Sequence, residues 1–256
     1  KYHFKPLYKM ILAICGPFFL LGALFIGGFY SELFKSIEPY GTTSVGFTFV
    51  KFILGFLLFA LGGVLLNGIV VEYMKATLSH RRADITFSIV WQGFRNRFWR
   101  YLGAILLVML ILMAAAFAFI LPAVWLGVIF SLIFFIIGIE NNSVGAGISR
   151  SFTLMRGYWW RSFGIYLLMG IIQSALSYAV AIPLYLINFV IIFSSSDPSG
   201  MTQSGMTMVS IITPVIFFIG ALAYSLSSIA AGVNYFSIVE VKEEVGLKER
   251  VEAIDT

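Results

Sequence analysis

Charged residues, histidine and cysteine are all scarce in this sequence. Only 11% of its 256 residues are Asp, Glu, Lys or Arg, whereas an average soluble domain carries about 25%. So few charges could not cover the surface of a soluble domain of this length. The composition therefore excludes a soluble domain, a disordered chain and a conventional nucleic-acid binder. The lone Cys15 also excludes a disulfide or a cysteine-rich metal site within a single chain.

Apolar residues are abundant instead. Hydrophobic residues make up 60% of the chain, and phenylalanine occurs 26 times. Long apolar runs of this kind are typical of a polytopic membrane protein built from helices, because a helix satisfies its own backbone hydrogen bonds inside a bilayer. The net charge of +5 then indicates membrane topology rather than nucleic-acid binding. The chain begins with Lys1 rather than Met, so we expect a further segment before it.

Six stretches are long and apolar enough to cross a membrane as helices, which takes about 20 residues each. We predict spans at 10–30, 46–73, 101–119, 123–139, from 162 onward, and at 208–238. The uncharged stretch 101–139 would overshoot the bilayer as one helix of about 58 Å, so we predict a hairpin turn at Pro122. Residues 184–193, after Pro183, either continue the fifth helix or form a short re-entrant segment. The segment 194–205 is predicted to be a polar loop.

Lysine and arginine gather on one side of the predicted spans. Fifteen of the 17 basic residues lie there: Lys1, Lys5, Lys9, Lys75, Arg81, Arg82, Arg95, Arg97, Arg100, Arg150, Arg156, Arg161, Lys242, Lys248 and Arg250. The other side has Lys35 and Lys51. Because basic loops stay in the cytoplasm, both termini are predicted to be cytoplasmic. Tryptophans favour membrane interfaces, which predicts Trp91, Trp99, Trp159 and Trp160 at the inner interface and Trp125 at the outer one.

Two segments repeat at an offset of 61 residues. An Arg, a Trp, an Arg and a Gly recur in order: Arg95, Trp99, Arg100 and Gly103 match Arg156, Trp160, Arg161 and Gly164. Each set follows an apolar stripe spaced by 4, 3 and 4 residues, namely Phe87, Trp91, Phe94 and Phe98, then Ile148, Phe152, Met155 and Trp159. Leu106–Leu107 match Leu167–Leu168, and Pro122 matches Pro183. This spacing is one face of a helix, so we predict amphipathic interfacial helices leading into the third and fifth spans.

The even-numbered spans share another feature, a glutamate at the cytoplasmic end. These residues are Glu72, Glu140 and Glu240. We therefore predict one membrane domain (1–256) made of repeat units at about 1–72, 73–140 and 141–240, with a cytoplasmic tail at 241–256. The expected fold class is all-α: six transmembrane helices arranged as three hairpins, with cytoplasmic amphipathic helices.

Both features have two interpretations. The three glutamates either pair with nearby arginines, which would anchor each amphipathic helix to the preceding span, or form a three-carboxylate cluster that binds a cation or a partner's basic segment. The amphipathic helices are either structural anchors with snorkelling side chains or binding sites for anionic lipid headgroups. The candidate headgroup contacts are Arg95, Arg97, Trp99, Arg100, Arg150, Arg156, Trp160 and Arg161.

Three segments carry a resemblance to a known family: RNRFWRYLG at 95–103, IENNSVGAGISRSFTLMRGYWWRSFGI at 139–165, and YFSIVEVKEEVGLKERVEAI at 235–254. From about residue 75 onward, the chain resembles a bacterial membrane-protein family labelled as the membrane domain of glycerophosphodiester phosphodiesterase. The label comes from members with a separate soluble phosphodiesterase barrel, which these residues do not contain, so that activity is not implied. The resemblance implies a multi-pass protein of the bacterial inner (cytoplasmic) membrane and leaves the function open.

Reactive groups are not arranged for catalysis in this sequence. His3 and His80 lie far apart, and neither belongs to a metal-binding pair. Glu243 and Glu244 fall in the predicted tail, where we expect a solvated run of charges. No ionisable residue lies near the centre of a predicted span, which argues against a proton-coupled transporter. We predict no catalytic residue, no cofactor-binding residue and no metal site.

Polar residues within the spans also have two interpretations. They either form hydrogen bonds between helices or line a path for lipid headgroups: Asn67, Gln173, Ser174, Ser177, Asn188, Thr213, Ser225, Ser227, Ser228 and Asn234. A polar lining of this kind favours a lipid or amphiphile transporter that is not coupled to protons. A non-catalytic membrane scaffold or accessory subunit of a cell-envelope complex is favoured instead by the lack of a reactive constellation, the small-residue faces of the helices and the charged cytoplasmic layer. Expected partners are anionic membrane lipids and a membrane protein or a second copy of the chain, and not nucleic acid.

Overall fold

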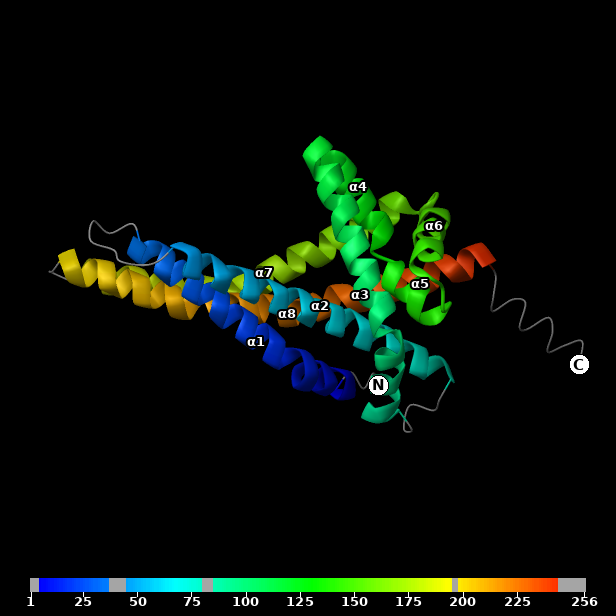
Figure 1. The fold of residues 1–256 in the computed structure, drawn as a ribbon, viewed down its shortest axis with the longest axis horizontal. Helices are drawn as coiled ribbons and strands as arrows, with labels where there is room; N and C mark the ends of the chain where they lie inside the picture. Colours follow the sequence, from blue (N-terminus) through cyan, green and yellow to red (C-terminus); the bar gives the residue numbers. More distant parts are fainter. Residues whose placement is uncertain (1–4, 37–44, 80–84, 195–197, 244–256) are drawn as a thin grey trace, which may run out of the picture. The chain divides into compact units, whose positions relative to one another are not determined.

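The structure, a computed structural model, describes residues 5–36, 45–79, 85–194 and 198–243. Every element in these ranges is an α-helix, which confirms the all-α prediction. The helices are α1 (Lys5–Ser36), α2 (Val45–Ser79), α3 (Phe87–Ala118), α4 (Ile120–Phe130), α5 (Ile133–Ile139), α6 (Val144–Met155), α7 (Trp159–Ser194) and α8 (Pro198–Glu243) (Figure 1). The predictions for Lys1, His3, His80, Arg81, Arg82, Glu244, Lys248 and Arg250 lie outside the described residues.

Six segments are long and apolar enough to cross a membrane, and the chain is therefore a polytopic membrane protein. These segments are Pro6–Leu33, Gly46–Ser79, Phe87–Ala118, Ile120–Ile139, Trp159–Ile187 and Ile211–Glu243. Each forms a helix because its backbone groups can then pair with one another without water. The fourth segment contains two helices, α4 and α5, since the chain leaves the helical path between them.

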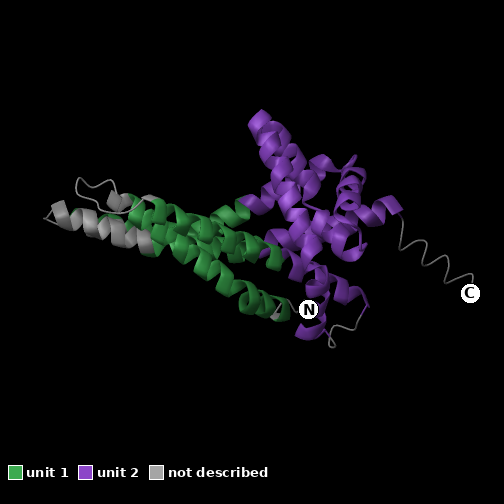
Figure 2. Cartoon of the chain, in the orientation of Figure 1, with its two compact units in different colours: residues 1–66, 171–224 green, residues 67–170, 225–256 purple. Residues whose placement is uncertain are grey.

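The chain divides into two compact units (Figure 2). Unit 1 consists of Lys1–Leu66 and Ile171–Tyr224, and unit 2 of Asn67–Gly170 and Ser225–Thr256. This division does not follow the boundaries of the repeat units expected from the sequence. Those repeat units stay a prediction.

In unit 1, α1 and α2 approach each other closely. A Cβ atom placed on Gly22 would lie 3.0 Å from the carbonyl oxygen of Gly55, so the two backbones meet where neither residue has a side chain. Farther along α1, Glu32 accepts a hydrogen bond of 3.1 Å from the Thr48 hydroxyl and pairs with Lys51. The later residue of α1 meets the earlier residues of α2, which shows that the two helices run antiparallel.

Unit 2 is built around buried aromatic rings. The rings of Phe94 and Tyr101 on α3 stack with centroids 6.0 Å apart, and Tyr101 stacks on Phe134 of α5 at 5.4 Å. On the α8 side, Phe135 stacks on Tyr235 with centroids 5.9 Å apart. Such pairs contribute favourably beyond their buried area. They fix α3, α5 and the end of α8 around one core.

The turn between α3 and α4 is shorter than the sequence predicts. Phe119 alone separates the two helices, with extended backbone angles of φ −164° and ψ 150°. Helix α4 begins at Ile120 rather than near residue 123, and Pro122 falls in its first turn, where the missing N–H leaves no hydrogen bond unmade. The hairpin predicted at this proline is therefore present, three residues earlier than expected.

Helix α7 answers a question that the sequence left open, and helix α8 corrects a prediction. Helix α7 runs without interruption to Ser194, with Pro183 inside it, so residues 184–193 continue the helix. Helix α8 begins at Pro198, which makes the prediction of a loop wrong for 198–205. Proline is favoured at the first position of a helix, because its φ is already helical and its missing N–H would have no partner there.

The two predicted amphipathic segments have different backbones. The first is continuous with the third span, and both lie in α3. The second forms a separate helix, α6, which ends at Met155 before α7 begins at Trp159. Gly157 lies between them with a φ of 86°, a left-handed value that glycine adopts without strain. This glycine lets the chain change direction.

One interface prediction is wrong. Trp125 and Trp159 were expected at opposite faces of the membrane, but the Nε1 of Trp159 donates a hydrogen bond of 3.1 Å to the carbonyl oxygen of Trp125. The two tryptophans therefore lie at the same level. The cause is α6, which carries the chain back along α4 so that α7 starts beside Trp125.

Candidate functional site

Two arginine–carboxylate centres lie in unit 2. The first, called here the Glu72 centre, consists of Glu72, Lys75, Arg97 and Tyr101. Arg97 donates to both carboxylate oxygens of Glu72 at 3.1 and 3.2 Å, and the Tyr101 hydroxyl donates to the same carboxylate at 2.8 Å. Arg97 and Tyr101 are four residues apart on α3, so they share one face of that helix. The carboxylate thereby joins α2 to α3.

The end of α5 closes this centre. The Lys75 ammonium donates to the carbonyl oxygen of Gly138 at 2.6 Å. Arg100 donates to the Asn141 side-chain oxygen at 2.9 Å. Asn141 has a left-handed φ of 57°, which asparagine tolerates better than most residues. Lys75 of α2 and Arg100 of α3 thus hold the end of α5 and the segment that follows it.

The second centre, called here the Glu140 centre, consists of Glu140, Asn142, Arg150, Tyr235 and Glu243. Arg150 on α6 donates to Glu140 at 3.1 and 3.2 Å, and it also pairs with Glu243 at the end of α8. The Tyr235 hydroxyl donates to Glu140 at 3.0 Å. Asn142 donates to the same carboxylate at 3.0 Å. One ionic group therefore joins α5, α6 and α8.

Arg150 carries its charge securely. Burial opposes that charge, but hydrogen bonds to Glu243 and Glu140 outweigh the burial and raise the pKa of the guanidinium above its usual value. The residue is therefore a permanent cation between two carboxylates. Such an arrangement holds helix ends in place, because both acids would repel each other without it.

The two interpretations of the glutamates can now be compared with the structure. Glu72 pairs with Arg97 and Glu140 with Arg150, as the anchoring interpretation predicts. Within the part of the chain that is described, no group of three or more His, Cys, Asp or Glu side chains could hold a metal ion. Among the described residues, Glu72, Glu140 and Glu240 therefore form no metal-binding group, and the alternative that they bind a partner's basic segment stays a prediction.

Sequence reasoning missed Glu243. It was assigned to a solvated run of charges, whereas it pairs with Arg150. A signal was available, because Tyr235 and Glu243 are eight residues apart and therefore share a face of α8. Both belong to the Glu140 centre.

The eight candidate headgroup contacts separate into two groups. Four arginines bind within the chain: Arg97 to Glu72, Arg100 to Asn141, Arg150 to Glu140, and Arg161 to Ser237 at 2.8 Å. Arg100 and Arg161 of this group are nevertheless exposed. The other four side chains are exposed as well: Arg95, Trp99, Arg156 and Trp160. Trp99 and Trp160 are each 78% exposed, an unusual value for so large an aromatic ring.

Several polar residues of the spans form hydrogen bonds between helices. The Ser228 hydroxyl donates to Asn67 at 2.9 Å, joining α8 to α2. The Asn234 side-chain nitrogen donates to Ser162 at 2.9 Å, joining α8 to α7. The side-chain oxygen of Asn234 is buried and has no hydrogen-bond partner among the described residues. The side chain of Asn188 lies outside the described residues.

Comparison with protein-family models, with curated proteins and with solved structures finds no match to this chain. The resemblance stated from the sequence therefore stays a prediction. What this protein does must be argued from its two centres and its exposed side chains.

Proposed function

We propose that this protein is a non-catalytic integral membrane scaffold or accessory subunit of a bacterial cell-envelope complex in the inner membrane. The Glu140 centre is the observation that carries the proposal. Arg150, in the middle of α6, bridges Glu140 and Glu243, so the ends of α5 and α8 are held to α6 by charge. A partly buried ionic network of this kind favours one fixed arrangement of helices, which a surface that binds a partner requires.

The exposed side chains support the same proposal. Arg95 and Trp99 project from α3, which the Glu72 centre holds. Arg156 directly follows α6, which the Glu140 centre holds, and Trp160 lies on the adjoining α7. Tryptophan and arginine are the residues most often found at energetically dominant contact points, and both also suit the headgroup region of a membrane. The expected contacts are anionic lipids and a membrane-protein partner. The excess of Lys and Arg on one side supports cytoplasmic N- and C-termini.

Native co-purification tests the scaffold proposal. The full chain is extracted in a mild detergent and its partners are quantified by mass spectrometry, with the expectation of a partner in stoichiometric amount. Arg150→Ala should lower the recovery of that partner several-fold, because it opens the Glu140 centre. Ser149→Ala is the matched control on the same helix and should leave recovery unchanged. A stable monomer without any partner in native membranes contradicts the proposal.

A lipid or amphiphile transporter without proton coupling is the second candidate. One observation favours it: the buried oxygen of Asn234 has unused capacity to accept a hydrogen bond, next to Ser162. A lipid headgroup hydroxyl could occupy that position. Reconstituted wild-type protein should then move a fluorescent phospholipid between leaflets, and Asn234→Leu should slow this movement at least several-fold. Equal rates for protein-containing and protein-free vesicles exclude this candidate.

A further inference from the structure

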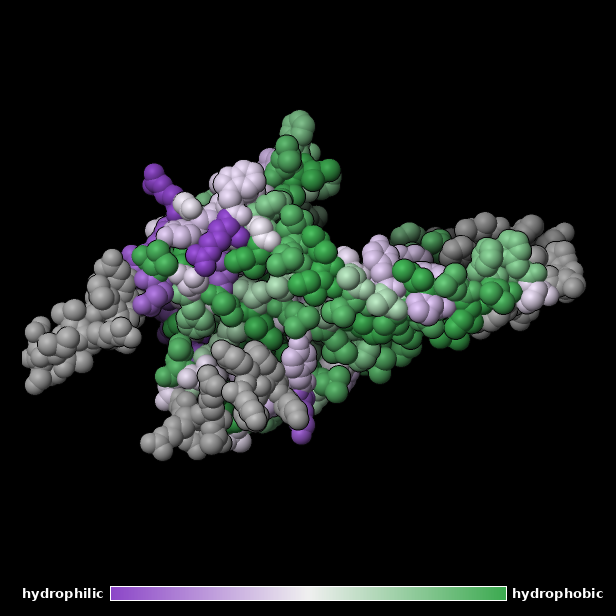
Figure 3. Space-filling view, turned by 180° about the vertical axis from the view of Figure 1, so that it is seen from behind, coloured by the Kyte–Doolittle hydropathy of each residue, from purple (hydrophilic) through white to green (hydrophobic). Residues whose placement is uncertain are grey.

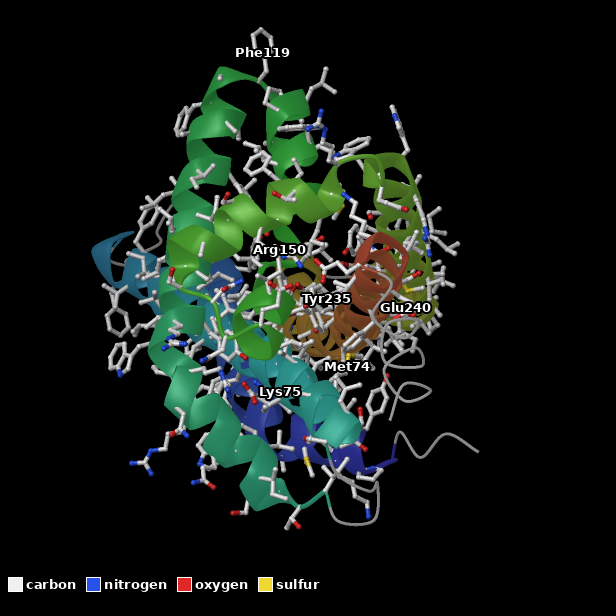
Figure 4. The ribbon with its side chains drawn as sticks, turned by 90° about the vertical axis from the view of Figure 1, so that its right-hand side faces the viewer. Met74, Lys75, Phe119, Arg150, Tyr235 and Glu240 are labelled. Carbon is white, nitrogen blue, oxygen red and sulfur yellow. The ribbon has the colours of Figure 1, made fainter. Side chains whose placement is uncertain are left out.

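The hairpin of α3, α4 and α5 ends in an apolar tip. Its turn is a single phenylalanine, Phe119, rather than a polar loop. The side chains at the tip are between 75% and 86% exposed, and all are apolar: Phe117, Phe119, Ile120 and Leu121. Figure 4 shows Phe119 at the end of the hairpin, directed away from the other helices. An exposed tip of this composition belongs in hydrocarbon rather than in water.

A polar helix runs along this apolar hairpin. The start of α6 lies beside α5, since a Cβ atom on Gly147 would lie 3.4 Å from Ile137. The end of α6 lies beside α4, where the ring centroid of Phe152 is 5.9 Å from that of Trp125. The later residue of α6 therefore meets the earlier helix. Helix α6 lies antiparallel to α4 and α5 along their common length.

Exposed polar side chains mark the outward face of α6. Ser149 and Thr153 are exposed four residues apart on this face, with the exposed ring of Phe152 beside them. The exposed Arg156 follows directly after the helix. On the neighbouring hairpin, exposed apolar side chains recur along α3 at spacings of 4, 3 and 4: Leu106, Leu110, Met113 and Phe117. The boundary between polar and apolar exposed side chains therefore runs along the helices. In a helix that crosses a bilayer, the polar side chains gather at the two ends instead. The apolar surface of the hairpin is visible in Figure 3.

The position of Trp159 also argues against a hairpin that crosses the membrane. If the hairpin crossed the membrane, its tip would lie about 28 Å from the level of Arg100, and Trp125 would lie about 9 Å short of the tip. Trp159 is bound to Trp125, and the exposed Arg156 and Arg161 lie next to it in the chain. Both arginines would then be near the middle of the bilayer, where a charged side chain is costly.

We propose that the α3–α5 hairpin and α6 lie within one leaflet, along the membrane interface, and that the hairpin does not cross the bilayer. The partner of this surface is the acyl and headgroup layer of the leaflet on the side rich in Lys and Arg. The apolar hairpin enters the upper acyl region, and the polar face of α6 faces the headgroups and water. Arg100, Arg156 and Arg161 then all lie at headgroup level. Both α3 and the α4–α5 segment are long enough to span, so the placement rests on the exposed polar side chains of α6 and on the contact between Trp125 and Trp159.

Depth measurements with spin labels test this placement. In a Cys15→Ala background, the full chain is labelled singly at Leu106→Cys, Leu110→Cys, Phe117→Cys and Thr153→Cys. The labelled chains are placed in vesicles of phosphatidylcholine and phosphatidylglycerol. Collision rates with oxygen and with a water-soluble nickel chelate report the depth of each label. Leu21→Cys is the matched control, since Leu21 is exposed near the middle of α1.

The three labels on α3 should share one depth of about 5–10 Å, typical of an interfacial helix. The Leu21 label should lie near the bilayer centre, about 15 Å deep, and the Thr153 label should collide freely with nickel. The proposal is overturned if Leu110 is as deep as Leu21 while Phe117 is shallower than Leu110, or if the Thr153 label is shielded from nickel.

A second measurement does not depend on the spin labels. Phe119→Cys in intact vesicles should resist a membrane-impermeant maleimide from both sides, because the tip stays within one leaflet. Lys35→Cys is the control for reagent access to the side opposite the basic residues. Modification of residue 119 from that opposite side shows that the hairpin emerges there, which overturns the proposal.

Discussion

Residues 87–107 and 148–168 carry the same sequence pattern 61 residues apart, yet their backbones differ. The first segment lies in one uninterrupted helix, α3. The second is divided into α6 and α7 at Gly157. Exposure nevertheless matches between the two copies: Trp99 and Trp160 are both 78% exposed, and Phe94 and Met155 are both buried.

The repeated pattern therefore determines which side chains are exposed and which are buried, and not the path of the backbone. Outward positions stay outward in both copies, although one helix is straight and the other is broken. One pair of equivalent buried positions is polar in both copies but has different partners. Tyr101 and Ser162 are equivalent and fully buried, but Tyr101 donates to Glu72 whereas Ser162 accepts from Asn234.

The two ionic centres also differ in the partners of their glutamates. Removing these glutamates should give the largest change in the free energy of unfolding. Glu72 is only 5% exposed, and its loss leaves Arg97 and the Tyr101 hydroxyl without their acceptor. Breaking a buried ion pair by removing one partner costs about 3–5 kcal/mol. We expect Glu72→Ala to lower the free energy of unfolding, measured in detergent micelles, by about 3 kcal/mol or more.

Glu140→Ala should cost less, about 1 kcal/mol, because Arg150 is partly exposed and keeps Glu243 as a partner. Glu72→Gln is the control for the first centre. Glutamine keeps an oxygen that can accept from Tyr101. The loss of unfolding free energy in Glu72→Gln should therefore fall between the losses in the two alanine variants. The expected difference arises because Arg97 pairs with one carboxylate whereas Arg150 pairs with two. Equal losses of unfolding free energy for Glu72→Ala and Glu140→Ala contradict it.

The broken backbone of the second copy gives the next prediction. Gly157→Ala places a side chain on a residue with a φ of 86°, and a left-handed conformation costs other residues about 1–2 kcal/mol. The added methyl group meets no neighbour, so the effect should come from backbone strain alone. We expect the free energy of unfolding to fall by about 1 kcal/mol in the same detergent assay.

Asn96→Gly at the equivalent position of α3 is the matched control. It should cost only a few tenths of a kcal/mol, from the lower helix propensity of glycine. Gly157→Asn should cost less than Gly157→Ala, because asparagine tolerates the left-handed region. A Gly157→Ala variant as stable as the wild type shows that the break between α6 and α7 does not require a left-handed residue.

Much of the fold could be predicted because helix periodicity and apolar length are local properties of the chain. The all-α class, the six apolar segments and the hairpin near Pro122 follow from them. The pairing of Glu72 with Arg97 and of Glu140 with Arg150 was one of two interpretations, and proximity to the next helix favoured it.

The remaining features depend on contacts between distant segments. Glu243 meets Arg150 across 93 residues, and only the continuation of α8 to Glu243 brings them together. Trp125 meets Trp159 because α6 folds back along α4. The left-handed turn at Gly157 had a local signal, a glycine inside a helical pattern, but the same signal also occurs inside continuous helices.

The smallest effect on stability is expected at the exposed positions that the two copies share. Arg95→Ala and Arg156→Ala should change the free energy of unfolding in neutral detergent by less than about 0.5 kcal/mol, because both side chains are exposed. Added phosphatidylglycerol should raise the melting temperature of the wild type. Each variant should lose a similar part of that rise, since a basic residue near an anionic surface contributes about 1 kcal/mol. Asn96→Ala, also exposed but uncharged, should keep the full rise. If one arginine variant loses the whole rise and the other none, the two copies do not contact lipid equivalently, and the matching exposure of Trp99 and Trp160 does not reflect a shared membrane surface.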